Sequence, residues 1–322
     1  MLYNTSVSEM RLGDEIEGFY MLTSASRRST AAGKTYLTGT LSDRSGSVEM
    51  VVWDYVGAIG PEDNGKAVKV RGRVSEYRSD RQFSVQRIRL ADGNDEYRAE
   101  ALVPAAPIDR EAELREIEAL IATMRDDDYR RLAEEAYRRN RDAFARLPAA
   151  KSVHHGFLGG LLMHTADMLQ IADFLAARYA EVINRDLLLC GTLLHDMAKS
   201  REFILSPLGL AVDYSLEGQL LGHPAMGAQE AAALAEELKL PREKSVLLQH
   251  LILSHHGDPE FGAAVRPMCA EAELLHLIDM IDSRMEIYAE TFESLPAGSF
   301  SGKIFALDRK IYRPTESEPI PD

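Results

Sequence analysis

The chain has 322 residues, of which 27% are charged and 45% hydrophobic. This composition excludes a disordered or collagen-like protein and fits two domains of ordinary size. The 37 basic and 51 acidic residues give a formal net charge of −14, which taken alone argues against a nucleic-acid partner, because binding phosphates usually needs a basic surface.

Cysteine usage and the N-terminal sequence favour a cytoplasmic protein that is not bound to a membrane. The two cysteines, Cys190 and Cys269, cannot build a disulfide framework. The first residues carry neither the basic nor the apolar region of a signal peptide. No apolar run approaches the roughly 20 residues that a membrane-spanning helix needs.

Short segments rich in β-branched and aromatic residues follow one another in the first 92 residues. Turn clusters rich in Gly, Ser, Asp and Pro separate most of them. The predicted strands are 17–23, 34–41, 48–53, 67–74 and 82–90. Five such strands fit a small Greek-key barrel, and the OB-fold is the commonest barrel of this length. We therefore predict a multidomain α and β protein in which residues 1–92 form an N-terminal OB-like β-barrel that binds nucleic acid.

The rest of the chain reads as helical. Residues 93–147 are expected to form a linker and connecting helices, since Leu114, Ile117 and Ile121 recur at helical spacing. Residues 148–292 predict an all-α helical bundle. Residues 293–322 predict a C-terminal extension, and its acidic, Pro-rich end is expected to be disordered.

All nine histidines lie after residue 153, which indicates a site in the bundle. The central pair is His195-Asp196, on a helix that is otherwise apolar. Burying these two side chains without a partner is costly, and a divalent metal is a suitable partner for imidazole and carboxylate. Lys199 follows His195 by four residues, so we expect it on the same helical face, where it would hold a phosphate oxygen.

Further histidines and a carboxylate recur at intervals of about 30 residues, which is one helix plus a loop each time. A helical bundle needs such spacing to aim side chains at one interior point. The side chains in question are His164, His223, His255 and Asp279. His and carboxylate ligands suit Mn, Fe, Co or Zn, so the type of ligand does not decide the metal.

The order His, His-Asp, His, His, Asp resembles HD-domain metal-dependent phosphohydrolases. The resemblance implies that one metal is held by His164, His195, Asp196 and Asp279. It also implies that His223 and His255 hold a second metal, with Asp196 bridging the two ions. Lys199 matches the lysine that often follows the His-Asp pair, and His256 would donate a proton to the leaving oxygen or bind the phosphate. The predicted catalytic residues are Asp196, Lys199 and His256.

Longer stretches of the chain resemble the YhaM-type 3′–5′ exoribonucleases, and the resemblance extends over nearly the whole chain. The matching stretches are 148–151, 154–161, 214–218, 221–223, 252–257 and 303–308. The resemblance implies hydrolysis of phosphodiesters at the 3′ end of single-stranded RNA to nucleoside monophosphates, with Mn²⁺ as the favoured metal. It leaves open whether single-stranded DNA is also a substrate.

OB-folds bind single strands by stacking bases on aromatic side chains along a basic groove. We expect Trp53 to fill the barrel core, because it ends an apolar strand. The predicted stacking residues are Tyr36, Tyr77 and Phe83. The predicted phosphate-binding residues are Arg71, Arg73 and Arg81.

Two other functions stay open at this point. The first is an HD phosphohydrolase that acts on a small or cyclic nucleotide, with the barrel serving for assembly. The second is a non-catalytic module that binds single strands. Metal number and a homo-oligomeric state are also open.

The acidic charge is distributed unevenly along the chain. Residues 1–100 carry 14 basic and 15 acidic residues, against 23 basic and 36 acidic residues in residues 101–322. The net charge therefore belongs to the helical part and does not exclude nucleic-acid binding by the barrel.

Overall fold

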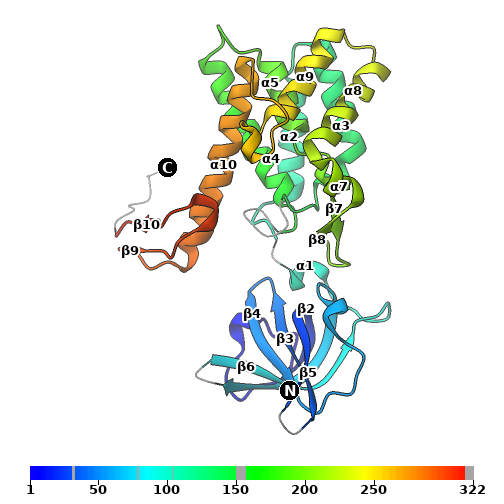
Figure 1. Cartoon of the computed structure of the whole chain (residues 1–322), viewed down its shortest axis with the longest axis vertical. Helices are drawn as coiled ribbons and strands as arrows, with labels where there is room; N and C mark the ends of the chain where they lie inside the picture. The colour runs from blue at the N-terminus through cyan, green and yellow to red at the C-terminus, as the bar shows by residue number, and fades with distance from the viewer. Residues whose placement is uncertain (31–32, 78–79, 104, 150–156, 316–322) are drawn as a thin grey trace. The chain divides into compact units, whose positions relative to one another are not determined.

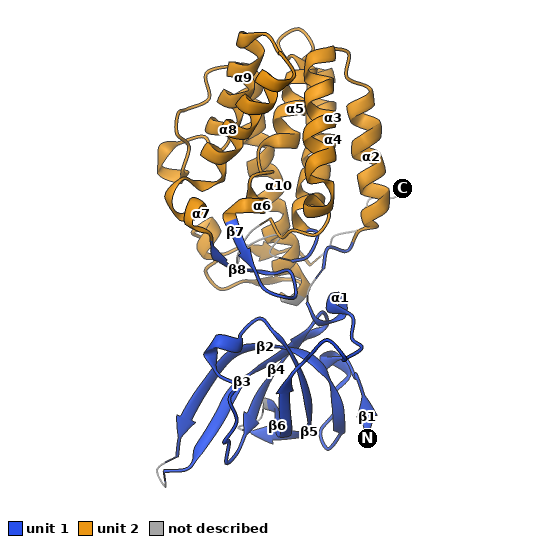
Figure 2. Ribbon diagram, turned by 90° about the vertical axis from the view of Figure 1, so that its right-hand side faces the viewer, with its two compact units in different colours: residues 1–107, 157–159, 203–214 blue, residues 108–156, 160–202, 215–322 orange. Residues whose placement is uncertain are grey.

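The computed structural model describes residues 1–30, 33–77, 80–103, 105–149 and 157–315. The chain divides into two compact units (Figure 2). Unit 1 comprises Met1–Pro107, Phe157–Gly159 and Phe203–Tyr214, and unit 2 comprises Ile108–Gly156, Gly160–Glu202 and Ser215–Asp322. Unit 1 thus takes two segments from within the sequence range 148–292 that we assigned to the bundle.

Unit 1 contains the predicted OB-like barrel, and all five predicted strands are present (Figure 1). Each is longer than predicted, although Lys34 and Trp53 fall just outside the strands. They are β2 (Glu15–Ser29), β3 (Thr35–Asp43), β4 (Gly46–Val52), β5 (Ala67–Tyr77) and β6 (Asp80–Leu90). The sheet runs β2-β3-β4-β6-β5, and β5 pairs back onto β2 to close the barrel. The β4–β6 pair is parallel, and the short strand β1 (Leu2–Tyr3) adds to β2. The single-turn helices η1 (Val7–Glu9) and η2 (Pro61–Asp63) lie outside the strands.

Side chains alternate across the barrel wall, as the period of two in a strand requires. On β5, Val68, Val70 and Val74 are buried in the core, whereas Arg71 and Arg73 lie outside. The β5–β6 register shifts between Arg71 and Gly72. Alternation therefore leaves one basic row on the outer surface of β5.

A second apolar cluster of unit 1 includes a hairpin that the sequence did not predict. We expected helices up to residue 292, but β7 (Phe203–Leu205) and β8 (Ala211–Tyr214) pair antiparallel. Leu208, in the turn of this hairpin, is buried in one cluster with Phe19 and Met21 of β2. The short helix α1 (Ala99–Leu102) contributes Leu102 to the same cluster. This apolar contact explains why the hairpin belongs to unit 1.

Unit 2 is the helical bundle (Figure 1). Its helices are α2 (Arg110–Ala122), α3 (Asp127–Phe144), α4 (Gly160–Arg178), α5 (Arg185–Leu194), α6 (Lys199–Glu202), α7 (Leu216–Leu220), α8 (Gly222–Glu237), α9 (Arg242–Ser254) and α10 (Ala270–Ser294). Helix α5 contacts α3, α4, α9 and α10, and every residue from Asp186 to Leu194 is buried. Helix α5 is therefore the central helix, and the turn after its last residue is held deep in the bundle.

Polar side chains fix where α5 begins. Asn184 caps it by accepting a hydrogen bond from the Leu187 N–H. Asp186 accepts hydrogen bonds from the backbone N–H groups of Arg125 and Asp126, both at 2.7 Å, which ties α5 to the start of α3. These bonds set the depth of α5 in the bundle and so the position of His195.

The chain after α10 holds a small hairpin, β9 (Ser299–Phe300) with β10 (Tyr312–Arg313). The single-turn helices η3 (Pro259–Phe261) and η4 (Phe305–Leu307) precede and follow α10. Residues 316–322, most of the end that we expect to be disordered, lie outside the described residues.

Candidate metal centre

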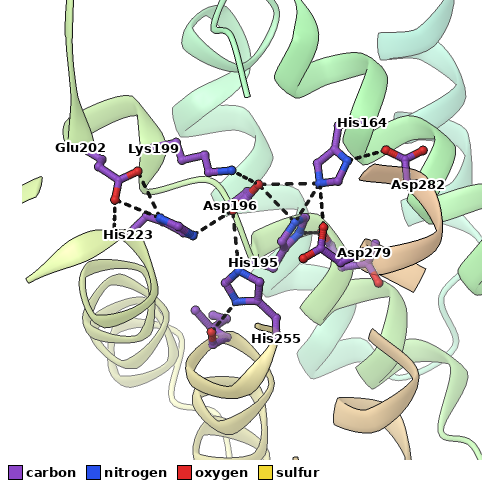
Figure 3. A network of polar contacts seen from close by, with 11 residues as sticks. His164, His195, Asp196, Lys199, Glu202, His223, His255, Asp279 and Asp282 are labelled. Carbon is purple, nitrogen blue, oxygen red and sulfur yellow. Dashed lines mark hydrogen bonds and ion pairs between the residues drawn. The ribbon is translucent and has the colours of Figure 1, made fainter. Parts of the chain in front are cut away.

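His195 and Asp196 come directly after α5, at the centre of the bundle. Their exposed fractions are 0% and 3%. Three of the four helices that contact α5 bring predicted ligands: α4 carries His164, α9 ends just before His255, and α10 carries Asp279. Figure 3 shows how these side chains surround Asp196.

One group of donor atoms faces the Oδ2 atom of Asp196. His195 Nε2 lies 3.3 Å and His164 Nε2 lies 3.7 Å from this oxygen. The two imidazole Nε2 atoms are 3.3 Å apart, and His164 Nε2 is 3.4 Å from Asp279 Oδ1. The fold therefore brings together the four residues predicted to hold one metal, from α4, α10 and the turn after α5.

A second group faces the other oxygen of the same carboxylate. His223, in the first turn of α8, places Nε2 3.2 Å from Asp196 Oδ1. His255 Nε2 lies 3.8 Å from this oxygen. The His256 ring packs against His255 and His223, with centroids 4.1 and 5.1 Å apart. Asp196 thus lies between two groups of histidines, with one oxygen toward each.

The unpartnered polar atoms of this cluster fit a divalent metal. Among the described residues, Asp196 Oδ1, His223 Nε2 and His255 Nε2 are buried without a hydrogen-bond partner, a costly state for polar atoms in a protein interior. Donor atoms that each lie about 2.1 Å from one ion are separated by about 3.0–3.5 Å, close to the spacings found here. Imidazole and carboxylate are standard ligands of divalent transition metals, so the site fits such an ion.

The charge states also suit a cation. Burial alone would raise the pKa of Asp196, but Lys199 and His195 hold it well below its usual range, so Asp196 is a carboxylate. Burial and the neighbouring His256 hold the pKa of His255 well below its usual range. Its ring is therefore neutral near pH 7 and has a free lone pair on Nε2.

Each of the four predicted ligand histidines is oriented through its Nδ1 atom. His195 Nδ1 and His255 Nδ1 donate to the backbone carbonyls of Thr192 and Ile252, both at 2.7 Å. His164 Nδ1 donates to Asp282 Oδ2 at 2.6 Å. With the proton on Nδ1, Nε2 keeps the lone pair that a metal requires.

Glu202 orients the His223 ring in the same way, through its Nδ1 atom. Its two carboxylate oxygens accept from His223 Nδ1 at 3.0 and 3.1 Å, and Oε1 also accepts from the His223 backbone N–H at 2.9 Å. Sequence reasoning missed Glu202 and Asp282. Their signal is weak: Asp282 follows Asp279 by one helical turn, and Glu202 follows Lys199 by three residues.

We expect Asp282→Asn and Glu202→Gln to lower metal affinity by about 10- to 100-fold, because each removes the anionic acceptor that orients a ligand histidine. The measurement is calorimetric titration of the metal-free protein with Mn²⁺. Asp173→Asn is the matched control, since Asp173 is a half-exposed residue of α4 that pairs with Arg185. Affinities equal to that control would contradict the assignment.

Lys199 lies near the site, although it is not on the same helix as His195. We expected it on one helical face with His195, but α5 ends at Leu194 and Lys199 begins α6. Turn residues separate the two helices. Lys199 Nζ nevertheless reaches Asp196 Oδ2, at 2.6 Å.

Two predictions about the barrel aromatics are wrong. Phe83 is 0% exposed in the core, so its ring cannot stack on a base. Trp53, which we expected in the core, is 57% exposed, because β4 ends at Val52 and the chain there leaves the barrel wall.

The other predicted nucleic-acid contacts lie on the barrel surface. Tyr77 is 55% exposed, and Tyr36 is half-buried and lies against Trp53, with ring centroids 5.1 Å apart. Arg71 and Arg73 are exposed. The Arg81 guanidinium donates to the carbonyl of Met10 at 2.9 Å, which occupies part of its hydrogen-bonding capacity.

Two further features of the sequence bear on the site and the chain as a whole. Residues 150–156, with His154 and His155, lie outside the described residues. Within the part of the chain that the structure describes, no helix combines the length and the apolar character needed to cross a bilayer.

Comparison with known proteins places the site in a family. The family model of the HD domain matches residues 161–284, the range that contains all six predicted ligands. The 3′-5′ exoribonuclease YhaM of Oceanobacillus iheyensis is 35% identical over 95% of this chain and 96% of its own length. The YhaM protein of Halalkalibacterium halodurans is 34% identical over 96% of each chain. The second OB-fold domain of replication protein A from Methanococcus maripaludis, 19% identical, covers 30% of this chain and 100% of that chain with a TM-score of 0.23.

The matches over 95–96% of the chain join the barrel and the bundle in one family, and the histidine and carboxylate cluster around Asp196 lies within the matched HD domain. The chain belongs to the YhaM family of 3′-5′ exoribonucleases.

Proposed function

We propose that this chain is a divalent-metal-dependent 3′–5′ exoribonuclease, which hydrolyses phosphodiesters at the 3′ end of single-stranded RNA and releases nucleoside monophosphates. The curated relatives support the reaction, since they are exoribonucleases by name and match nearly the whole chain. The matched HD domain supports metal-dependent hydrolysis. Single-stranded DNA is a second substrate to test.

One observation carries this proposal: the two oxygens of Asp196 face two different pairs of histidines. A carboxylate so placed can bridge two ions. We therefore propose two bound ions, and Mn²⁺ as the metal, since His and carboxylate ligands accept it. Bound divalent ions polarise a phosphoryl oxygen and lower the pKa of a water molecule.

The chain's own residues position the substrate. Lys199 is held at Asp196 and offers its ammonium group to a phosphate oxygen. Burial, with His223 close by, lowers the pKa of His256 to about 4. The ring is therefore neutral near pH 7, and we assign it a hydrogen bond to the phosphate in preference to proton donation. We also propose that the protein acts in the cytoplasm, in agreement with its two free cysteines. A homo-oligomeric state is a further proposal.

The test uses 5′-end-labelled single-stranded RNA with a panel of Mn²⁺, Fe²⁺, Co²⁺, Zn²⁺ and Mg²⁺. We expect a ladder of products shortened from the 3′ end, and 3′-end-labelled RNA should release labelled mononucleotide from the first turnover. A panel of cyclic nucleotides and nucleoside triphosphates runs in parallel. Turnover of small nucleotides without any shortened RNA would favour the small-nucleotide phosphohydrolase, and neither product would favour the non-catalytic module.

A further inference from the structure

The barrel surface holds a cavity of about 600 Å³ that is separate from the metal centre. It lies where β4 leaves its partner. The parallel pairing of β4 with β6 extends over Glu49–Val51 and Gln82–Ser84. After Val52, the last residue of β4, residues 53–57 leave the sheet while β6 continues. The walls are residues 52–57, Lys69–Arg71 of β5, Gln86–Arg89 of β6 and Glu17 of β2.

The acidic groups of this cavity are already paired. Glu17 forms an ion pair with Lys69 at 3.3 Å, and Asp54 forms one with Lys34 at 3.1 Å. Arg89, a cation of the cavity wall, is held by Asp95 through two hydrogen bonds of 2.5 and 2.6 Å. The charges within each of these pairs neutralise each other. Two cations of the cavity wall remain outside the pairs.

Arg71 and Arg87 are those two cations. Neither forms an ion pair with any residue that the structure describes. They are register partners across β5 and β6, and both are exposed. Like charges directly opposite each other destabilise a sheet, and the residue opposite Arg71 on the β2 side, Glu17, forms its ion pair with Lys69. Two guanidinium groups kept in such a position are suited to an anion that neutralises both.

An aromatic ring lies at the same cavity. Trp53 is a wall residue and is 57% exposed. Tyr36 packs against its ring at a centroid distance of 5.1 Å and an angle of 33°, which supports the indole from one side. A supported but exposed indole beside unpaired arginines combines the two contacts that single-strand binding uses, base stacking and phosphate attraction.

We propose that this cavity binds one nucleotide of single-stranded RNA, with the base stacked on Trp53 and the phosphate held by Arg71 and Arg87. The proposal rests on the proposed action on RNA and names where the barrel holds the strand. A strand is favoured over a free nucleotide because the basic row continues. Arg73, the next outward residue of β5, is exposed and has no ion-pair partner among the described residues.

The test takes advantage of the composition, since Trp53 is the only tryptophan of the chain. The full-length, metal-loaded protein is titrated with a phosphorothioate oligouridylate, which keeps the backbone charge and resists hydrolysis. Binding is followed by the anisotropy of a 5′ label and, in parallel, by tryptophan emission. We expect saturable quenching of the emission with the same midpoint as the anisotropy change.

Variants assign the contacts. Trp53→Ala should weaken binding by about 5- to 150-fold, the range of one base–aromatic stack, whereas Trp53→Phe should stay near the natural affinity. Arg71→Ala and Arg87→Ala should each weaken binding and reduce the slope of log Kd against log salt by about 0.7, the value for one phosphate contact on a single strand. Arg11→Ala removes an exposed barrel arginine outside the cavity and should change neither quantity.

Three results would overturn the proposal. The first is RNA binding that leaves the tryptophan emission unchanged, and the second is Arg71 and Arg87 variants that behave like Arg11→Ala. The third is quenching by uridine monophosphate at the same nucleotide concentration that equals quenching by the strand, which would indicate a mononucleotide site. None of these measurements depends on turnover. Binding as expected without RNA shortening would therefore leave this site in place while the exonuclease proposal fails.

Discussion

Asp196→Asn is expected to reduce RNA hydrolysis by about 10³-fold or more, which corresponds to roughly 4 kcal/mol of transition-state stabilisation. The variant should also lose bound metal. An asparagine side chain has one oxygen where the natural residue directs two, toward His164 and His195 on one side and toward His223 and His255 on the other. It also leaves Lys199 without its partner at 2.6 Å.

Two measurements check this result: the single-turnover rate on labelled RNA, and the metal content per chain by mass spectrometry. Asp173→Asn, on the surface of α4, is the matched control and should keep both values. RNA binding to the barrel should be close to natural in both variants. A metal content and rate within threefold of the natural protein would show that Asp196 is not the shared ligand.

Removing the metal is expected to lower the melting temperature of the helical bundle by about 5–10 °C. An ion at 100 times its Kd stabilises the folded state by about 2.7 kcal/mol, and 1 kcal/mol moves the transition of a unit of this size by about 2–4 °C. The effect comes from the ligand positions, since α4, the turn after α5, α8, the turn after α9 and α10 each contribute at least one. An ion would cross-link these segments and satisfy the unpartnered polar atoms.

Two spectroscopic signals separate the units in this experiment. Far-ultraviolet circular dichroism is dominated by the helices of unit 2, whereas tryptophan emission reports Trp53 in unit 1. We expect chelation to shift the first transition, and Asp196→Asn to abolish the difference between metal-loaded and metal-free protein. Equal melting temperatures with and without metal in the natural protein would argue against a structural contribution of the ion.

The sequence predicted the histidine and carboxylate cluster around Asp196 better than the carboxylates that orient its histidines. His195-Asp196 stands out because a histidine and a carboxylate in an otherwise apolar segment are costly to bury without a partner. The other predicted ligands repeat at the spacing of one helix and one loop. Glu202 and Asp282 gave no such signal. A single carboxylate in a helix is ordinarily on the surface, and its role emerges only when the fold brings His164 or His223 beside it.

The barrel shows the same limit. Segments rich in β-branched and aromatic residues predicted the five strands β2 to β6. Whether a given side chain points into the core depends on where the strand pairing ends. Phe83 lies within the paired part of β6 and points into the core, whereas Trp53 follows the last residue of β4 and escapes the wall. The hairpin β7–β8 was missed because its strands are three and four residues long, too short for a period to show.

That hairpin sets an order of events during synthesis. Leu208 completes an apolar cluster whose other members include Phe19 and Met21 of β2, so the barrel emerges from the ribosome before the residue that covers part of it. At roughly 5–20 residues per second, the remaining stretch of about 100 residues keeps this surface uncovered for about 5–20 s. The hairpin segment of unit 1 is therefore synthesised several seconds after the barrel that it covers. A fragment ending at residue 107 would lack this segment and would leave the apolar surface of the barrel exposed.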